Sequence, residues 1–383
     1  MKRTKRISAV AILAAALILL ILAIHQSKES PALHRYAATF FGAFDTVTEV
    51  VGYAETEEDF TAQVEQLKER LMYYHRLYDI YNEYPNLNNV KTINEHAGIM
   101  PVQVDKEITE LLLYSKELYE YTDGRMNIAM GSVLSIWHTY REAGNNDPGT
   151  AKLPPMEELK AAAEHMDIGQ LQIDEEASTV YLADGEMSLD VGSIGKGYAV
   201  QKVAEYAREI GMEHVLISVG GNVCAVGGKP AVGGKPAMDG NPASGGKTAV
   251  GGKPAVDGNP AGGWRLGIQN PDLESPEAYV ATVEVTDASV VTSGDYQRYY
   301  MVDGKRYGHI VDPATLMPAD YFPAVTIITE DSGLADGLTT ALYNMSVEDG
   351  IAFVNGIDGM EAVWVLKDGS LRYTDGFERY LVK

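Results

Sequence analysis

One segment, residues 188–200, constrains the fold of this chain more than any other. Its sequence is SLDVGSIGKGYAV, in which an apolar stretch ends in glycines and a lysine and then gives way to a helix-forming run. This order predicts an apolar strand, a tight turn and a helix over 198–210. Glycines let the main chain turn where a Cβ atom would clash, and the free N–H groups at the start of a helix attract phosphate. Because Lys196 adds a positive charge, we expect either a phosphate site or, equally, a plain strand-to-helix turn.

The spacing of these glycines matches neither of two well-known nucleotide-binding patterns. It differs from the G-x-G-x-x-G pattern of dinucleotide-binding folds and from the G-x-x-x-x-G-K-[ST] pattern of P-loop proteins. The turn by itself therefore predicts neither a dinucleotide fold nor a nucleoside triphosphatase.

Composition limits the possible partners and the redox chemistry. The chain has 383 residues, of which 45% are hydrophobic, and this is enough for one large core or two modest ones. Its formal net charge of −23 would repel a phosphate backbone, so we exclude nucleic acid as a partner. The one cysteine, Cys224, cannot form an intramolecular disulfide, and we expect it to be a structural thiol in the core.

The N-terminus differs sharply from the rest of the chain. Four basic residues among the first six precede an apolar run over 7–24, which is about long enough to span a bilayer. The positive-inside rule would keep those charges in the cytoplasm and place the rest of the chain outside it. We expect residues 1–27 to be a signal peptide or a membrane anchor, and the lack of a clear cleavage pattern favours the anchor. The predicted localisation is the cytoplasmic membrane, with an extracytoplasmic catalytic domain.

After this segment we expect a short tether over 28–36 and a single domain over 37–383. Hydrophobic periodicity predicts helices and strands in irregular order, which is typical of an α+β fold with mixed sheets and packed helices rather than of a regular βαβ repeat. The expected helices cover residues 58–78, 105–122, 156–165, 198–210, 335–345 and 347–356. The expected strands lie at 37–54, 171–173, 179–182, 214–218, 264–268, 279–285, 290–293, 296–301, 306–311, 325–329, 362–365 and 371–374.

A low-complexity segment over 226–263 interrupts this pattern. The motif GGKPAV recurs there at intervals of about six residues, with GGKTAV and DGNPA as variants. Glycine and proline at this density can bury almost nothing, so we expect a surface loop, an expanded hairpin tip between two strands. Loop extension costs little free energy, and we assign this segment no chemistry.

A carboxylate and a hydroxyl stand at helical spacing in the C-terminal part of the chain. Asp336 and Thr340 are four residues apart in the sequence ADGLTTA, so they lie on one face of the expected helix. With a main-chain carbonyl from a glycine turn, they would offer the hard oxygen ligands that Mg²⁺ prefers. Spacing alone favours the alternative, in which Asp336 caps the helix and Thr340 bonds to its own backbone.

Three further segments carry groups that can serve a site or simply build a turn. His309 is expected near a strand end, three residues before Asp312, where an imidazole can be a general base or a structural group. The small residues of 292–296 would allow a ligand to approach closely. The turn at 122–128 mixes polar and apolar groups, which suits an aromatic ring system with polar edges. A lone histidine on a strand is more often structural, and the other two segments are equally typical of an ordinary turn.

Taken in order, these segments resemble the ApbE family of FAD:protein FMN transferases. The resemblance extends from about residue 44 to the C-terminus, and it is specific because seven separate motifs agree. It implies an ApbE-like (T-fold-like) core within the α+β fold. The motifs are FDTV at 44–47, TDGRMNI at 122–128, LDVGSIGKGYAV at 189–200, GGN at 220–222, TSGDY at 292–296, HIVDP at 309–313 and ADGLTTA at 335–341.

The resemblance implies an activity, a metal and a set of site residues. The implied reaction is the Mg²⁺-dependent transfer of the FMN moiety of FAD to a threonine hydroxyl of an exported or membrane-bound acceptor flavoprotein, with release of AMP. The metal would be held by the Ser193 carbonyl, Asp336 and Thr340, and His309 would be the catalytic base. The residues implied to bind FAD are Phe44, Tyr81, Arg125, Met126, Asn127, Asp190, Lys196 and Ile310.

Two features depart from the family pattern. Asn127 stands where the family usually carries aspartate, so the contact made there differs in charge. The repeat segment at 226–263 has no family counterpart of this length, and we expect the fold to tolerate it because it falls in a loop.

Other functions would use the same features. An FAD pyrophosphatase would hydrolyse FAD to FMN and AMP with the same metal and pyrophosphate geometry if water replaced the acceptor threonine. A non-catalytic protein would bind and store FAD without chemistry. A structural extracytoplasmic protein is a third alternative, which a lack of FAD binding would favour.

Overall fold

The computed structural model describes residues 32–230 and 262–382. The expected signal or anchor segment, the first part of the expected tether (28–31) and residues 231–261 of the expected repeat loop lie outside the described residues. Within the described residues, no helix has both the length and the apolar character that a bilayer crossing requires. The first strand, β1 (His34–Phe41), begins inside the segment that the sequence predicts to be a tether.

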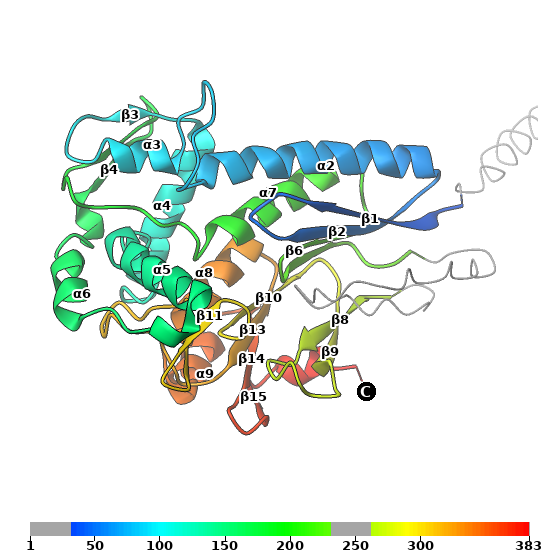
Figure 1. Ribbon diagram of the computed structural model, residues 1–383. Helices are drawn as coiled ribbons and strands as arrows, with labels where there is room; N and C mark the ends of the chain where they lie inside the picture. Colours follow the sequence, from blue (N-terminus) through cyan, green and yellow to red (C-terminus); the bar gives the residue numbers. More distant parts are fainter. Residues whose placement is uncertain (1–31, 231–261, 383) are drawn as a thin grey trace, which may run out of the picture.

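An eight-stranded sheet forms the centre of the molecule (Figure 1), in the order β1-β2-β6-β7-β10-β13-β14-β15. After β1, its strands are β2 (Val47–Ala54), β6 (Val215–Val219), β7 (Asn222–Val226), β10 (Ser289–Gly294), β13 (Ala324–Thr329), β14 (Glu361–Val365) and β15 (Leu371–Tyr373). The α+β class is confirmed, but the expected mixed sheets are wrong. Every pairing between named strands of the described residues is antiparallel, because short turns join several neighbouring strands directly.

Both faces of this sheet are buried, which explains why its inner strands are almost continuously apolar. Successive side chains of a strand point to opposite faces. In β2, Val50 packs on the helical side of the sheet and Val51 on the other side, and Ile217 and Leu216 of β6 divide in the same way. Cys224 of β7 is a buried free thiol on the helical side, as expected of a structural cysteine.

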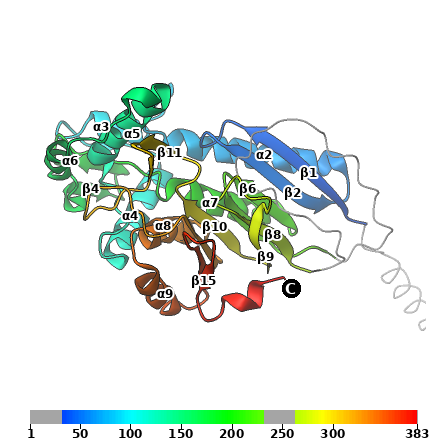
Figure 2. The same cartoon turned by 60° about the horizontal axis from the view of Figure 1, so that its bottom comes forward.

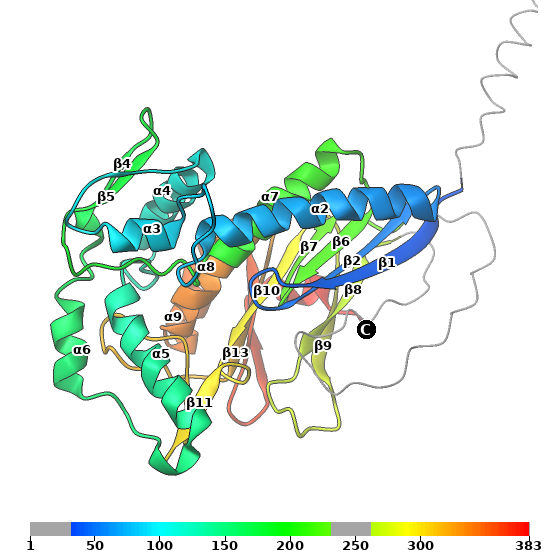
Figure 3. The same cartoon turned by 45° about the horizontal axis from the view of Figure 1, so that its top comes forward.

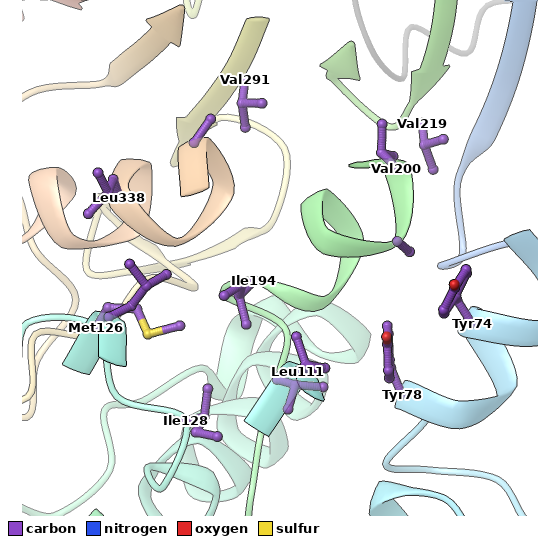
Figure 4. Packing of buried hydrophobic residues seen from close by; sticks show 14 of the residues in the cluster. Tyr74, Tyr78, Leu111, Met126, Ile128, Ile194, Val200, Val219, Val291 and Leu338 are labelled. Carbon is purple, nitrogen blue, oxygen red and sulfur yellow. The ribbon is translucent and has the colours of Figure 1, made fainter. Parts of the chain in front are cut away.

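Helices α2 (Glu57–Tyr78), α7 (Gly195–Glu209) and α8 (Ser332–Tyr343) cover one face of the sheet (Figure 3). The first of these begins after Thr56, whose hydroxyl accepts from Asp59 N at 3.1 Å. Its buried residues recur every three or four positions, so one stripe of the helix faces the sheet. Figure 4 shows the apolar core that these helices share with the sheet and with α4 (Lys106–Tyr121). A further helix, α9 (Val347–Asn355), packs on β14.

A two-stranded sheet covers the opposite face (Figure 2). Strands β8 (Trp264–Gln269) and β9 (Tyr279–Val285) pair antiparallel, and their apolar residues pack with Phe377 against the large sheet. Strands β7 and β8 belong to different sheets and do not pair with each other directly, and residues 231–261 between them lie outside the described residues. The described ends of this segment still meet: Lys229 N donates to Gly262 O at 2.7 Å, and Gly262 N donates to Lys229 O at 3.3 Å.

A smaller lobe lies to the left of the large sheet in Figures 1 and 3. Within it, α5 packs against both α6 and β11. The lobe contains α4 and the following elements: α3 (Val90–Glu95), β3 (Val102–Gln103), α5 (Gly131–Asn146), α6 (Met156–Ala163), β4 (Leu171–Asp174), β5 (Thr179–Leu182), β11 (Tyr299–Val302) and β12 (Lys305–Gly308).

Four local predictions differ from the structure. The sequence predicts no helix over 131–146, where α5 lies, and none at α3. The expected strand before the glycine-rich turn is also wrong, because Ser188 makes only an isolated bridge with Met130. Gly195 N donates to Val191 O at 2.7 Å, so α7 begins at Gly195 rather than near residue 198.

Candidate active site

A cavity of about 880 Å³ is lined by the α7–α8 pair, by strands of the large sheet and by the smaller lobe. It brings together every residue that the sequence predicts for the site except Met126. The predicted residues that line it are Phe44, Tyr81, Arg125, Asn127, Asp190, Ser193, Lys196, His309, Ile310, Asp336 and Thr340.

The glycine-rich turn lines one part of the cavity. Asp190 N donates to Ile128 O at 2.8 Å, which ties this turn to another predicted site segment. The Asp190 carboxylate accepts from Gly192 N at 2.8 Å. Burial raises the pKa of Asp190, and the nearby positive charges of Arg141 and Arg298 act in the opposite direction. The carboxylate is therefore stabilised by cations that share the cavity.

Helices α7 and α8 meet closely at Gly197. A Cβ atom at this position would lie 2.3 Å from Asp336 Cβ and 2.4 Å from Ser332 O, so the contact requires glycine. The Gly197 N–H donates to Asp336 Oδ2 at 2.7 Å, in the first turn of α7, where N–H groups have no helical partner. Asp336 is only 6% exposed, and this bond fixes its carboxylate at the cavity wall.

Three residues with oxygen ligands, Ser193, Asp336 and Thr340, line the cavity beside this helix contact. Thr340 Oγ1 donates to Ser193 O at 3.4 Å and to Asp336 O, one turn earlier in α8, at 3.4 Å, so the expected bond from Thr340 to its own helix backbone is present. The cap of α8 is Asp331, whose carboxylate accepts from two N–H groups of the first turn, so the alternative in which Asp336 caps the helix is wrong. A carboxylate, a hydroxyl and a carbonyl form the hard oxygen set that fits Mg²⁺.

Lys196 reaches the same carboxylate from α7. Its Nζ lies 3.8 Å from Asp336 Oδ1 and also contacts Asn222 Oδ1. Asn222 begins β7 after Gly220 and Gly221, whose φ angles of 53° and 94° make the tight turn that a residue with a Cβ rarely adopts. Burial lowers the pKa of Lys196, and Asp336 partly offsets this effect. An anionic ligand in the cavity would stabilise the ammonium further.

His309 enters the cavity from the β11–β12 hairpin. It follows Gly308, the last residue of β12, and so lies just beyond the strand rather than within it as expected. Its Nδ1 lies 3.3 Å from Arg298 O, and because a carbonyl only accepts, this contact places the proton on Nδ1 and leaves the Nε2 lone pair free. Burial, together with the charges of Arg298 and Arg141, lowers the pKa of His309 to about 3. The imidazole is therefore neutral near pH 7.

Comparison with known proteins agrees with this arrangement. The sequence model of the ApbE family matches residues 44–238 and 242–364, which is most of the chain. The chain belongs to the ApbE family. An FAD:protein FMN transferase of Klebsiella pneumoniae (strain 342) is 29% identical over 282 residues, or 73% of this chain and 76% of the relative. An FAD:protein FMN transferase of Treponema pallidum (strain Nichols) is 30% identical over 290 residues, or 74% of this chain and 72% of the relative.

Solved ApbE structures share the fold. The crystal structure of the ApbE protein from Thermotoga maritima matches with a TM-score of 0.73 at 26% identity, over 91% of this chain and 100% of that chain. The apo form of the flavinyl transferase ApbE from Pseudomonas stutzeri matches with a TM-score of 0.68 at 23% identity, over 91% and 97% of the two chains. The family resemblance predicted from the seven motifs is therefore confirmed.

Two arginines of this ApbE site were missed by the sequence analysis. Arg141 lies on α5 and Arg298 immediately precedes β11, and both line the cavity. A signal for α5 is present in the sequence, because its buried residues Val133, Trp137 and Gly144 recur at helical intervals. Arg298 has no comparable signal, since an arginine in a turn is usually a solvated surface residue.

Two aromatic residues predicted to bind a ring system line the cavity from separate loops. Phe44 has a φ of 52° in the turn between β1 and β2, and its N–H donates to His75 Nδ1 at 3.2 Å. Tyr81 N donates to the Asp79 carboxylate at 2.7 Å, and the Tyr81 ring lies 5.5 Å from the ring of His138 between centroids. Because Tyr81 is 59% exposed, part of its surface is open to a flat ligand.

Met126 is the predicted FAD contact that the structure removes from the cavity. It is fully buried in the apolar core, near Leu338 and Ile194 (Figure 4). Its neighbours Arg125 and Asn127 both line the cavity, so the side chain between them points the other way. The motif predicts that all three residues contact FAD, although only Arg125 and Asn127 line the cavity.

Asn127 makes two hydrogen bonds that together require its side-chain amide. Its Nδ2 donates to Met166 O at 3.1 Å, and its Oδ1 accepts from Ala129 N at 2.8 Å. The residue is 8% exposed, so both bonds lie away from bulk water. An ionised carboxylate could accept from Ala129 but could not donate to Met166. The amide therefore joins two parts of the smaller lobe in a way that aspartate cannot.

Proposed function

We propose that this chain is an FAD:protein FMN transferase, which uses Mg²⁺ to transfer the FMN moiety of FAD to a threonine hydroxyl of an acceptor flavoprotein and releases AMP. One observation carries the proposal: the oxygens of Ser193, Asp336 and Thr340 line the same cavity as a neutral His309. The Klebsiella and Treponema relatives, both named FAD:protein FMN transferases, support it.

We assign the metal to Ser193 O, Asp336 and Thr340. Mg²⁺ is usually bound by one or two carboxylates together with substrate phosphates, and this set leaves room for phosphate oxygens. When bound there, the ion would offset negative charge on the pyrophosphate of FAD. Lys196, with its Nζ 3.8 Å from Asp336 Oδ1, would add a second positive charge to the same region.

In the proposed reaction, the threonine oxygen of the acceptor attacks the phosphorus on the FMN side of the pyrophosphate. A new P–O bond forms, the bond to the bridging oxygen breaks, and that oxygen leaves with AMP. The hydroxyl proton passes to Nε2 of His309, the nitrogen left free by the contact between Nδ1 and the Arg298 carbonyl. His309 is thus the catalytic base, and the main-chain carbonyl of Arg298 sets its orientation.

The remaining predicted residues would hold FAD. A volume of about 880 Å³ is suited to a ligand of this size, since small-molecule sites span about 300–1,000 Å³. We propose that Phe44 and Tyr81 pack against the flat rings of FAD. Asn127 and Arg125 would contact the polar edges of these rings. We assign Asp190, Lys196 and Ile310 to further contacts with FAD. Met126 supports this region only by packing beneath it.

We further propose that the domain works outside the cytoplasm, attached to the cytoplasmic membrane, and modifies an exported or membrane-bound flavoprotein. The support is the basic N-terminus and the apolar run over 7–24. Fractionation of cells that express the full chain, followed by protease treatment of spheroplasts, tests this placement. Recovery of the chain in the soluble cytoplasmic fraction would overturn it.

The activity is tested by incubating the full chain with FAD, Mg²⁺ and a candidate acceptor and measuring the acceptor mass. We expect an added FMN on a threonine, and the same amount of AMP released. His309→Gln should lower the rate by about 10²- to 10⁴-fold, the usual range for loss of a general base. His165→Gln is the matched control, because this histidine pairs with Asp184 at 2.7 Å on the surface and does not line the cavity.

Two other outcomes would contradict the proposal. Rapid release of AMP without an acceptor, and without any modified protein when an acceptor is added, would indicate an FAD pyrophosphatase. Quenching of flavin fluorescence without any AMP release or modification would indicate a protein that only binds FAD.

A further inference from the structure

Two guanidinium groups line the cavity near Asp190 without forming an ion pair with it. Arg141 of α5 is partly buried and Arg298, which precedes β11, is exposed. Arg141 Nη2 lies 2.9 Å from His138 Nδ1, which is a nitrogen and not a counter-charge. In the part of the chain that the structure describes, neither guanidinium forms an ion pair with an acidic side chain. Unpaired arginines inside a cavity are well suited to bind an anion.

The electrostatic effects of these arginines converge on His309. The positive charges of Arg298 and Arg141 both lower the pKa of His309, and Lys196 acts in the same direction with a smaller effect. Arg298 also lowers the pKa of Lys196, and burial lowers the pKa of Arg141. The cations therefore destabilise one another across a shared space, and Asp190 and Asp336 offset this effect in part. An anion placed in that space would relieve this repulsion, although the chain as a whole carries a net charge of −23.

We propose that Arg141 and Arg298 form a phosphate subsite that works without metal and holds the phosphate of the FMN half of FAD beside His309. This inference rests on the proposed function, because that function requires His309 to meet a hydroxyl attacking the same phosphorus. Both guanidinium groups act on His309, so the phosphate they bind is the one under attack. Guanidinium groups suit this role, since their planar donors can bind two phosphate oxygens at once.

The subsite also explains how His309 could act as a base despite its low pKa. A histidine with a pKa of about 3 is a weak base for a hydroxyl proton. Phosphate bound to Arg141 and Arg298 would offset the two charges that depress this pKa, so the basicity of His309 would rise once substrate is bound. Arg298 thus has two roles. Its carbonyl oxygen, 3.3 Å from Nδ1, orients the imidazole of His309, and its guanidinium binds the phosphate.

The subsite is tested by comparing FMN with riboflavin, which lacks only the phosphate. Binding is followed by flavin fluorescence, with the full chain in EDTA, so neither metal nor acceptor contributes. The parent protein should bind FMN about 10- to 100-fold more tightly than riboflavin, as expected for one or two charge-assisted contacts. The Arg141→Ala, Arg298→Ala double variant should lose most of this preference and keep only the part that Lys196 contributes, with unchanged affinity for riboflavin.

Further variants keep the test decisive. Arg372→Ala is the matched control, because it removes one positive charge from an exposed residue of β15 that does not line the cavity; its FMN preference should equal that of the parent. If the double variant fails to fold, Arg141→Lys and Arg298→Lys keep the charge but lose the planar donors, and each should reduce the preference severalfold. A full FMN preference in the double variant, or in both lysine variants, would overturn the subsite.

A second readout follows His309 directly. FMN should raise the pKa of His309 measured by NMR in the metal-free protein, and riboflavin should leave it unchanged. Equal pKa values with the two flavins would contradict the coupling between phosphate and imidazole. These assays involve no turnover, so they separate the two proposals. If the parent protein prefers FMN to riboflavin but transfers no FMN to an acceptor, the proposed function is wrong and the phosphate subsite remains supported.

Discussion

The two sides of the cavity are built in different ways. We call the α7–α8 side, with Ser193, Asp336 and Thr340, the helix wall, and the side with Arg141, Arg298 and His309 the hairpin wall. On the helix wall, main-chain contacts hold a buried carboxylate, as in the bond from Gly197 N to Asp336. On the hairpin wall, unpaired cations surround a histidine held by one main-chain contact. Substitutions that disturb the packing of the helix wall should therefore affect folding as well as activity. Substitutions on the hairpin wall should mainly change the charge of the cavity.

The largest effect is expected at the closest contact of the helix wall. Gly197→Ala would force a Cβ atom to within 2.3 Å of Asp336 Cβ and 2.4 Å of Ser332 O, so α7 and α8 would have to separate. We expect a loss of about 3 kcal/mol or more in the free energy of unfolding, at the upper end of overpacking. Denaturant unfolding measures this loss. Gly149→Ala is the control, because its nearest contact would be an ordinary 3.5 Å, and equal stability of the two variants would contradict the close-contact argument.

Asp336→Asn separates charge from packing on the same wall. The amide oxygen can still accept from Gly197 N, so we expect the fold to be retained. Loss of the one carboxylate assigned to Mg²⁺ should lower the transfer rate by about 100-fold or more. Transfer rates measured over a range of Mg²⁺ concentrations should show this loss, and the variant should need a higher Mg²⁺ concentration to reach half of its maximal rate. Asp358→Asn, at an exposed loop position outside the cavity, should behave as the parent; unchanged metal dependence of Asp336→Asn would remove Asp336 from the metal site.

Asn127→Asp tests the support behind the hairpin wall, because this residue precedes α5. The carboxylate would lose the 3.1 Å bond to Met166 O and place two acceptors together at a site that is 8% exposed. We expect the free energy of unfolding to fall by about 1–3 kcal/mol at neutral pH. Asn145→Asp is the control, since its bond to Tyr299 O at 3.3 Å is exposed and water can replace it. Wild-type stability of Asn127→Asp would mean that the amide bond contributes nothing.

At neutral pH the smallest effect concerns the charge balance of the hairpin wall, because this effect appears only as the pH falls below about 6.5. The pKa of His309 is lowered to about 3 in the folded protein, against about 6.5 in an unfolded chain. Between these values the unfolded state binds a proton that the folded state does not, so His309 makes the protein less stable as the pH falls from 6.5 towards 3. His309→Gln should therefore lose less stability than the parent over this range in urea unfolding curves. Parallel curves for the two proteins would show that the folded pKa is not depressed.

Much of the helix wall could be predicted from the sequence, because its groups lie in short motifs with local geometry. Asp336 and Thr340 share a helix face by spacing alone, and the glycines of 188–200 indicate a tight turn. Local spacing could not decide whether Asp336 caps the helix, since that depends on Asp331 starting α8 earlier than expected. The strand expected before the turn does not form, because Asp190 N pairs with Ile128 O in an irregular segment rather than in a ladder.

The hairpin wall was less predictable, because its residues come together only in three dimensions. Arg141 and Arg298 are far apart in the sequence, and neither belongs to a polar motif with recognisable spacing. Apolar residues recur at helical intervals in α5, the helix that carries Arg141, but polar and small residues interrupt this pattern. The same limit applies to Met126: the motif placed it in the site, and only the packing shows that it faces the core.

The paired main-chain bonds between Lys229 and Gly262 have a consequence for how this chain can change. They fasten the two ends of a repetitive segment to each other, close to where Trp264 Nε1 donates to Gly227 O at 3.0 Å. The number of repeats between these ends can then change without disturbing β7 and β8, because those strands are held by pairings that do not involve the repeats. This position is therefore the natural place to splice a reporter or an affinity tag into the domain.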